Sequence, residues 1–378
     1  MHEGSRTDIL SYLEDMGVRF NAIGIPLVRV SLSLDDFHPE VVGRSYAWHR
    51  TQGREEIDRR YTPRRAESYW DSPVRVIHEG AAAVRRRLED PQVPLDFGVT
   101  RELKATGVTD YAGLVLRFSD GSRQFISFAT DRAGGFSDED LTAFDTLLPF
   151  ISARIEIEHA RRSTEQLLNT YLGRDAARQV IAGTIRRNAG NAIEAIVLAS
   201  DLRGFTRLAD QLPAPAVIEA LGEYFEAVAQ PVRRAGGDII KMVGDGILAI
   251  FPLGERTPAR DAEAAALALD AVRQAVAGLA AASGAVLPAG VGPLRAGFAL
   301  HAGEVTFGNV GARDRLDFTV IGLAVNEAFR LEALTKTLGV SAVTSARFAA
   351  MLGHDGLRSA GFHVLRGVRE AREVFTAV

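Results

Sequence analysis

The sequence predicts a mixed α+β fold made of two parts that a long helix connects. From about residue 192 onward, apolar strands alternate with amphipathic helices, which is typical of a sheet covered by helices. The first 136 residues contain shorter strand and helix signals, including a hairpin. Between these parts, apolar residues recur at three- and four-residue steps, which indicates a helix. A chain of 378 residues is long enough for two or three domains.

The N-terminal part, residues 1–136, begins with two predicted strands. Leu27–Leu34 alternates apolar and polar residues like a half-buried strand, and Glu40–Arg50 resembles a second one. Pro73–Glu89 has a helical pattern. Leu114–Phe118 and Arg123–Thr130 flank the sequence SDGS, and because Asp-Gly favours a tight turn, we expect them to form a hairpin.

Residues 137–191 are predicted to form a connecting helix and a linker. Ser137 is a good N-cap residue, and three acidic residues follow it in the first turn. The apolar seam of this helix comprises Leu141, Phe144, Leu148, Ile151 and Ile155. Two interpretations remain open, since the seam is too short to identify a coiled coil: it packs on its own domain, or it pairs with a second chain and carries a signal.

The C-terminal part, residues 192–378, starts with Ala195–Ser200, a continuous apolar run typical of a central strand. The elements expected after it are the helices Phe205–Gln211 and Ala216–Ala235, the strands Ile239–Val243 and Ile247–Phe251, the helix Ala262–Ala282, the strand Leu294–Leu300 and a helix from about Val325 to Thr337. Pro231 is expected to kink or end the second helix.

One uncharged stretch, Gln274–Leu294, is long enough to span a bilayer. It contains four glycines and two prolines, and its apolar residues are mostly alanine. These features indicate the end of a helix, a loop and the start of a strand. We therefore expect no membrane span.

The composition excludes several kinds of site. Without cysteine, the chain has no disulfide, no thiolate zinc site and no cysteine nucleophile, which suits a reducing compartment. A net charge of -4 gives no reason to expect nucleic-acid binding. The charged N-terminus lacks the apolar core of a signal peptide, so we expect a cytoplasmic location.

Two aspartates and a glycine-led helix start indicate a phosphate and metal site. Asp201 directly follows the apolar strand, although taken alone it is better explained as a turn or N-cap residue. Gly204, Phe205 and Thr206 then open a helix, whose first N–H groups favour a phosphate. Asp245 lies at a predicted hairpin tip. If that hairpin lies beside the strand before Asp201, the two carboxylates suit Mg²⁺ or Mn²⁺, and two such ions about 4 Å apart activate a hydroxyl and steady a leaving oxygen.

Four motifs give this part a resemblance to a known family. They are DLRGFT (Asp201–Thr206), GGDIIKMVGDGILAIF (Gly236–Phe251), HAGEVTFGNVG (His301–Gly311) and DFTVIGLAVNEAFRLE (Asp317–Glu332). With these motifs in order, residues 192–378 resemble the class III nucleotidyl cyclase catalytic domain, which has a ferredoxin-like or palm-type βαββαβ sheet. The resemblance implies attack of the ribose 3′-hydroxyl on the α-phosphate, giving a cyclic nucleotide and pyrophosphate.

The resemblance also implies roles for single residues. Asp201 and Asp245 match the aspartates that bind two Mg²⁺ or Mn²⁺ ions, with the Leu202 carbonyl as an extra ligand. The segment 204–206 matches the loop that contacts the triphosphate. Lys241 and Thr319 match the positions that read the purine, where lysine goes with ATP and glutamate with GTP.

Asn326 and Arg330 match the pair that holds the ribose and stabilises the transition state. Four residues apart on a predicted helix, they share one face, and an arginine there offsets charge that develops on the phosphoryl group. Taken alone, Arg330 is also explained as a surface partner of Glu327 or Glu332, and Lys241 as a strand residue that points to solvent. Arg366, in the last hairpin, is a candidate polyphosphate contact or a solvated charge.

Three residues depart from the family pattern. Thr319 stands where many members have aspartate, and its hydroxyl still forms a hydrogen bond with adenine. Leu323 replaces a polar residue, and Phe329 is bulkier than usual. The last two are expected to affect ribose or dimer packing.

In this family each site forms between two subunits, so the resemblance implies an ATP-binding homodimer with two shared sites. A guanylate cyclase is one alternative, which Lys241 argues against. A diguanylate cyclase needs an acidic residue after GGD, where Ile239 stands. An inactive dimeric binding module is the third alternative, and the retained metal, ribose and transition-state residues argue against it.

Residues 17–162 resemble a GAF-like sensor in the order of their elements, which implies regulation by an unknown small-molecule or protein signal. The aromatic candidates for a ligand pocket are His38, Trp48, His49, Trp70 and His78. Their spacing indicates no metal or haem site, so core or surface roles are the favoured interpretation.

Overall fold

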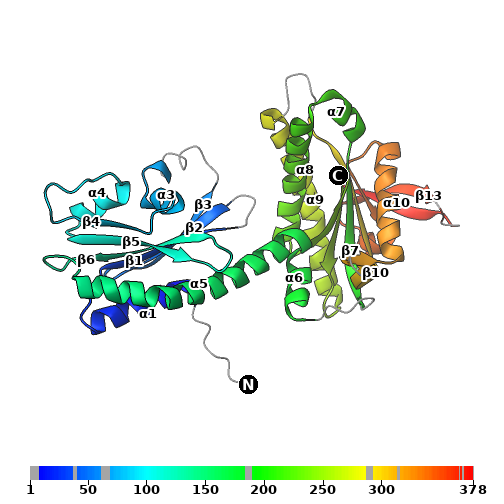
Figure 1. Ribbon diagram of the computed structural model, residues 1–378. Coiled ribbons are helices and arrows are strands. Elements are labelled where there is room, and N and C mark those ends of the chain that lie inside the picture. The colour runs from blue at the N-terminus through cyan, green and yellow to red at the C-terminus, as the bar shows by residue number, and fades with distance from the viewer. Residues whose placement is uncertain are drawn as a thin grey trace. The chain divides into compact units, whose positions relative to one another are not determined.

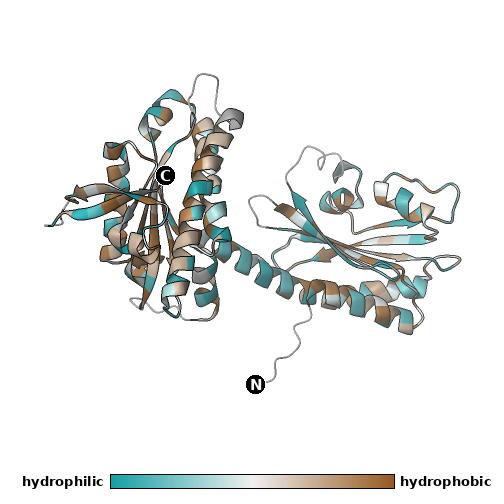
Figure 2. Ribbon diagram, turned by 180° about the vertical axis from the view of Figure 1, so that it is seen from behind, coloured by the Kyte–Doolittle hydropathy of each residue, from teal (hydrophilic) through white to brown (hydrophobic). Residues whose placement is uncertain are grey.

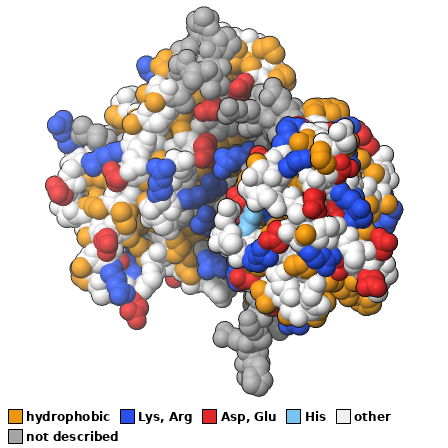
Figure 3. Space-filling model, turned by 90° about the vertical axis from the view of Figure 1, so that its left-hand side faces the viewer, with side chains coloured by type: hydrophobic (Ala, Val, Ile, Leu, Met, Phe, Trp, Pro, Cys, Tyr) orange, Lys and Arg blue, Asp and Glu red, His pale blue; other side chains and the backbone are white. Residues whose placement is uncertain are grey.

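The computed structural model describes residues 8–36, 41–60, 69–183, 190–286, 293–312, 316–365, 367 and 370–377. The chain divides into two compact units, residues 1–167 and 168–378 (Figure 1). On the face shown in Figure 3, acidic and basic side chains are interspersed with apolar ones.

The first unit is a six-stranded antiparallel sheet with the order β3-β2-β1-β6-β5-β4. Its strands are β1 (Arg29–Asp35), β2 (Val41–His49), β3 (Gly53–Arg60), β4 (Ala83–Arg87), β5 (Asp110–Arg117) and β6 (Arg123–Thr130). Helices α1 (Ile9–Ala22) and α5 (Asp138–Leu172) cover one face, while α3 (Pro73–His78) and α4 (Gly98–Ala105) lie on the other (Figure 1). Each face therefore has its own apolar core.

The predicted hairpin around SDGS is confirmed as β5–β6. Gly121 adopts a φ of 86°, and the Ser122 N–H donates to Oδ1 of Asp120 at 2.8 Å. The predicted helix Pro73–Glu89 is wrong beyond His78, because Gly80 takes a left-handed φ of 120° and Ala83–Arg87 pairs with β5. Tertiary pairing there overrides the local helical pattern.

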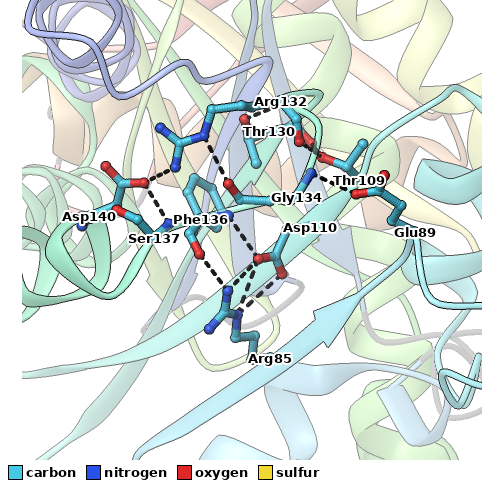
Figure 4. Close-up of polar contacts among 11 residues, drawn as sticks. Arg85, Glu89, Thr109, Asp110, Thr130, Arg132, Gly134, Phe136, Ser137 and Asp140 are labelled. Carbon is cyan, nitrogen blue, oxygen red and sulfur yellow. Dashed lines mark hydrogen bonds and ion pairs between the residues drawn. The ribbon is translucent and has the colours of Figure 1, made fainter.

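The start of α5 is fixed by polar contacts to the sheet edge. Asp110 on β5 is fully buried, and it accepts hydrogen bonds from Nη2 of Arg85 at 2.7 Å and from the N–H of Phe136 at 3.0 Å (Figure 4). Ser137 and Asp140 form a reciprocal capping box, with bonds of 2.8 and 3.2 Å. Asp140 also pairs with Arg132 (Figure 4).

The apolar seam predicted for α5 packs on the sheet of its own unit. Phe144 stacks on Phe128 with ring centroids 4.3 Å apart, and Ile151 and Ile155 are buried beside it. Other apolar side chains of α5 remain exposed in the single chain: Leu147, Phe150, Ile157, Leu167 and Tyr171. The predicted seam therefore packs on its own domain. The exposed apolar side chains of α5, which we call its outer stripe, have no cover in the single chain.

The second unit contains an eight-stranded sheet with the order β13-β14-β12-β10-β7-β9-β8, and β11 pairs with β10. Its strands are β7 (Gly190–Leu202), β8 (Asp238–Val243), β9 (Gly246–Pro252), β10 (Ala296–Gly311), β11 (Leu316–Ile321), β12 (Ala342–Ser345), β13 (Leu357–His363) and β14 (Arg372–Ala377). The β10–β12 pair is parallel and the other pairs are antiparallel.

The helices of this unit lie on both faces of its sheet. They are α6 (Arg174–Ile181), α7 (Phe205–Gln211), α8 (Ala214–Arg234), α9 (Pro258–Val286), α10 (Leu323–Leu338) and α11 (Ala346–Met351). Figure 1 shows α8 and α9 on one face and α10 on the other, and Figure 2 shows apolar residues concentrated on the strands between them. Helix α8 continues through Pro231 and ends within one turn of it.

The segment from β7 to β10 has the βαββαβ arrangement that the sequence predicts. Its four strands have the spatial order β10-β7-β9-β8, with α8 and α9 as the crossover helices. Within the described part of the chain, one stretch of α9, Pro258–Ala281, is long and apolar enough to cross a membrane by length and composition alone. Its inner side chains, such as Leu269 and Val272, belong to the apolar core beneath the sheet.

Candidate active site

The structure brings Asp201 and Asp245 to the same end of the sheet. Asp201 lies at the end of β7, where it pairs with Gly246, the first residue of β9. Asp245 immediately precedes β9, and its carbonyl accepts a hydrogen bond from the N–H of Leu202 at 3.1 Å. Gly244, with a φ of 62°, permits the tight turn that leads into this contact. The hairpin tip therefore lies beside the end of the central strand.

The electrostatics at this point favour a cation. Burial and the nearby charge of Asp201 raise the pKa of Asp245. The side chain of Asp201 is 29% exposed, and its Oδ2 lies 2.8 Å from Nζ of Lys336 on α10. The hydrogen bond to Asp201 raises the pKa of Lys336. The negative charges of Asp201 and Asp245 thus attract the ammonium group of Lys336.

Glu332 on α10 packs against Gly297 on β10, beside Asp201. Gly297 pairs with Asp201 across β10 and β7, and a Cβ there would lie 2.3 Å from Oε1 of Glu332. Glu332 is buried, and burial together with the charge of Asp201 raises its pKa. Arg203, next but one after Asp201, donates to the carbonyl of Val340 just beyond α10. The end of α10 is therefore fixed against the strands that carry Asp201.

The segment 204–206 begins a helix next to the aspartates. Gly204 has a φ of 73° at the N-cap of α7, and its carbonyl accepts from the N–H of Leu208 at 3.0 Å. Phe205 packs partly into the core, while Thr206 is exposed. Gly204 and Thr206 are exposed and follow Asp201 closely in the chain, and a helix start next to a carboxylate suits a phosphate chelated to a cation.

Lys241 and Thr319 come from β8 and β11, which are not paired with each other in the sheet. Lys241 on β8 forms an ion pair with Asp317 on β11, and Thr319 lies two residues further along β11, on the same face as Asp317. The side chain of Lys241 is 41% exposed. The predicted strand position of this lysine is confirmed, whereas no sequence pattern indicates Asp317 as its partner.

Asn326 and Arg330 lie one turn apart on α10. Asn326 is exposed, and Arg330 is partly buried with its guanidinium beside Gly367. Among the described residues, Arg330 has no ion pair with Glu327 or Glu332. The α10 residue that contacts Asp201 is Lys336, six positions after Arg330, or about 9 Å along the helix axis. Arg366 lies outside the described residues.

The donors at this end of the sheet fit a hard divalent cation. Two carboxylates and the Leu202 carbonyl are oxygen donors of the kind that Mg²⁺ prefers, and such an ion usually keeps phosphate and water as its other ligands. Lys336 acts as a stand-in cation on Asp201. Among the described residues, no group of three or more His, Cys, Asp or Glu side chains forms a separate metal cluster.

The aromatic candidates that the structure describes in the first unit lie in different surroundings. Trp48 is buried against Gly17, and Trp70 is exposed. His49 lines a cavity of about 380 Å³, and burial lowers its pKa, whereas His78 lies near the hydroxyl of Tyr69 at 3.3 Å. His38 lies outside the described residues.

Known proteins resemble this chain over its second unit. Residues 190–358 match the family model described as the adenylate and guanylate cyclase catalytic domain. Adenylate cyclase 1 of Rhizobium meliloti is 32% identical over 159 residues, which are 42% of this chain and 23% of that protein. The adenylate cyclase of Anabaena cylindrica is 34% identical over 143 residues, which are 38% of this chain and 28% of that protein.

Among solved structures, the adenylyl cyclase CyaB from P. aeruginosa is 24% identical, with a TM-score of 0.44 over 50% of this chain and 96% of that chain. The match covers between 23% and 37% of the length of these and other curated relatives.

Proposed function

Residues 190–358 form a class III cyclase catalytic domain, and we propose that the chain is an adenylate cyclase that converts ATP to 3′,5′-cyclic AMP and pyrophosphate. The observation that carries this proposal is the position of Asp201 and Asp245 side by side, next to the helix start at Gly204. Carboxylates and a triphosphate repel each other, so their position side by side is explained by a cation that binds both.

The residues of the chain divide the work of the reaction. Asp201, Asp245 and the Leu202 carbonyl would hold two Mg²⁺ or Mn²⁺ ions, which activate the ribose 3′-hydroxyl and stabilise the leaving oxygen. The N–H groups at 204–206 orient the β- and γ-phosphates. Arg330 offsets the negative charge that grows on the α-phosphoryl group, and Asn326 orients the ribose.

We propose that each site is shared by two copies of the chain. Arg330 lies about 9 Å along α10 from the residue that contacts Asp201, and this separation supports a role for Arg330 at the aspartates of a partner. Apolar side chains near these residues are exposed in the single chain, above all Leu323, which is 82% exposed, and Phe329. A homodimer would cover them, together with the outer stripe of α5.

Selectivity for ATP rests on Lys241 and Thr319. Both present donors: an ammonium that pairs with the purine N1 acceptor of adenine, and a hydroxyl that also accepts from the adenine amino group. A glutamate at position 241 would favour guanine instead. A guanylate cyclase is the second candidate function, and the lysine is the observation against it.

The first unit, with its own sheet and cores, is proposed as a GAF-like sensor for an unknown small-molecule or protein signal. The cysteine-free composition favours the cytoplasm.

The direct test incubates the purified full chain with ATP or GTP and either Mg²⁺ or Mn²⁺, and measures the cyclic nucleotide by chromatography. We expect cyclic AMP from ATP in excess over cyclic GMP from GTP. Formation of cyclic GMP alone would replace the proposal with the guanylate cyclase, and formation of neither product by a folded dimer would refute both.

A further inference from the structure

Lys336 contacts a proposed metal ligand although no motif points to it. Its Nζ lies 2.8 Å from Oδ2 of Asp201, and its charge also acts on Asp245. Among the described residues, the ion pair of Lys336 with Asp201 is its one salt bridge. A single ammonium group of the chain therefore contacts one carboxylate of the candidate metal site, and its charge favours the ionised form of the other.

The fold keeps Lys336 in this position. Glu332, one helical turn earlier, is 5% exposed and packs on Gly297. Gly297 is the residue that pairs with Asp201 in the sheet, and a Cβ there would lie 2.3 Å from side-chain atoms of both Glu332 and Thr335 on α10. Close packing of α10 on β10 thus positions the backbone of Lys336 next to the strand that carries Asp201.

The ammonium and a divalent cation compete for the same oxygen. Mg²⁺ requires carboxylate oxygens at about 2.0–2.1 Å in near-octahedral geometry. The Oδ2 of Asp201 that accepts from Lys336 is then occupied by a donor, and the ammonium repels a second cation at this range. Without any cation, however, Asp201 and Asp245 repel each other and the site would spread.

We propose that Lys336 is a positioning residue that holds Asp201 in place while the site lacks metal and leaves Asp201 when a divalent cation binds. The inference rests on the proposed metal site and adds a residue that controls it. Lys336 keeps the two carboxylates in a ligating arrangement, and it also lowers the affinity of the free protein for metal. Metal binding then depends more strongly on the charge that the triphosphate brings.

The test measures metal binding without nucleotide and without turnover. The full chain is titrated with Mn²⁺, and free Mn²⁺ is followed by electron paramagnetic resonance. Because both side chains are partly exposed, Lys336→Met is expected to bind Mn²⁺ about fivefold more tightly, which corresponds to about 1 kcal/mol. Lys336→Arg, which keeps the charge, is expected to stay within about twofold of the wild type.

Two further variants separate the outcomes. Thr337→Met adds a similar apolar side chain at an exposed neighbouring position and is expected to leave Mn²⁺ affinity unchanged. Asp201→Asn is expected to lose Mn²⁺ binding. If Asp201→Asn loses it but Lys336→Met binds no more tightly than the wild type, the role of Lys336 is overturned and the metal site stands. If Asp201→Asn binds Mn²⁺ like the wild type, the metal assignment in the proposed function is overturned as well.

Discussion

Replacing Lys241 by glutamate is expected to lower kcat/KM for ATP by about 10- to 150-fold. A hydrogen bond from a charged donor contributes about 1.5–3 kcal/mol, and each 1.36 kcal/mol corresponds to about a factor of ten in rate. The variant removes the ammonium proposed to meet the adenine ring and puts a carboxylate in its place.

The same substitution is expected to leave the fold intact. The Lys241 and Asp317 side chains are 41% and 50% exposed, so their ion pair contributes at most about 1 kcal/mol to stability. A loss of activity in Lys241→Glu would then report on substrate binding and catalysis. Circular dichroism and sedimentation check that the fold and the oligomeric state are unchanged.

The assay compares initial rates of cyclic AMP and cyclic GMP formation over a range of ATP and GTP concentrations with Mn²⁺. Lys241→Met removes the ammonium without adding a negative charge, so it separates the lost contact from new repulsion. Asp317→Asn frees the ammonium from its partner and is expected to keep ATP kinetics within about twofold. Unchanged ATP kinetics in both Lys241 variants would refute its role in base recognition.

Three other perturbations test the stability of the chain, its assembly and its requirement for metal. Burial alone would raise the pKa of Asp140, but hydrogen bonds from Ser137 and Arg132 hold that pKa below its usual range. Its stabilising effect is therefore present above about pH 4 and lost as the pH falls through the lowered pKa, so Asp140→Asn should cost about 1–2 kcal/mol at pH 7 and less in acid. Urea unfolding followed by tryptophan fluorescence measures this, because both tryptophans lie in residues 1–167, and an equal cost at pH 7 and pH 3 would contradict it. Leu323→Glu should shift the protein from dimer toward monomer in sedimentation velocity, and an unchanged dimer would remove Leu323 from the interface. Chelation by EDTA should abolish cyclic AMP formation and added Mn²⁺ should restore it, whereas activity that survives full chelation would rule out the metal mechanism.

Local signals in the sequence predicted the hairpin and the central strand. The Asp-Gly turn between β5 and β6 and the apolar run in β7 each act through neighbouring residues, so they are visible in sequence. The error after His78 has the opposite cause. The apolar residues Val74, Ile77, Val84 and Leu88 fit a helix, and only the pairing with β5 makes the last part a strand. The edge strand β3 was missed because its exposed residues are mostly charged.

The candidate site shows the same limit. Asp201 and Asp245 belong to motifs, and the sequence spacing of strands was enough to suggest that they meet. Lys336 contacts Asp201 across 135 positions of the chain, and Lys241 meets Asp317 across 76. Neither contact leaves a local pattern, since each depends on which strands and helices the sheet brings together. The spacing of Glu332 and Lys336 on one helix face was the only available hint.

The shared site is tested most directly by mixing two inactive variants. Asp201→Ala lacks a metal ligand and Arg330→Ala lacks the group that stabilises the transition state, so each is expected to be nearly inactive alone. In a refolded or co-expressed equal mixture, half of the dimers are heterodimers, and each has one intact site. The mixture is therefore expected to recover about a quarter of wild-type cyclic AMP formation. No recovery in heterodimers whose formation has been verified by affinity tags would contradict the shared-site model.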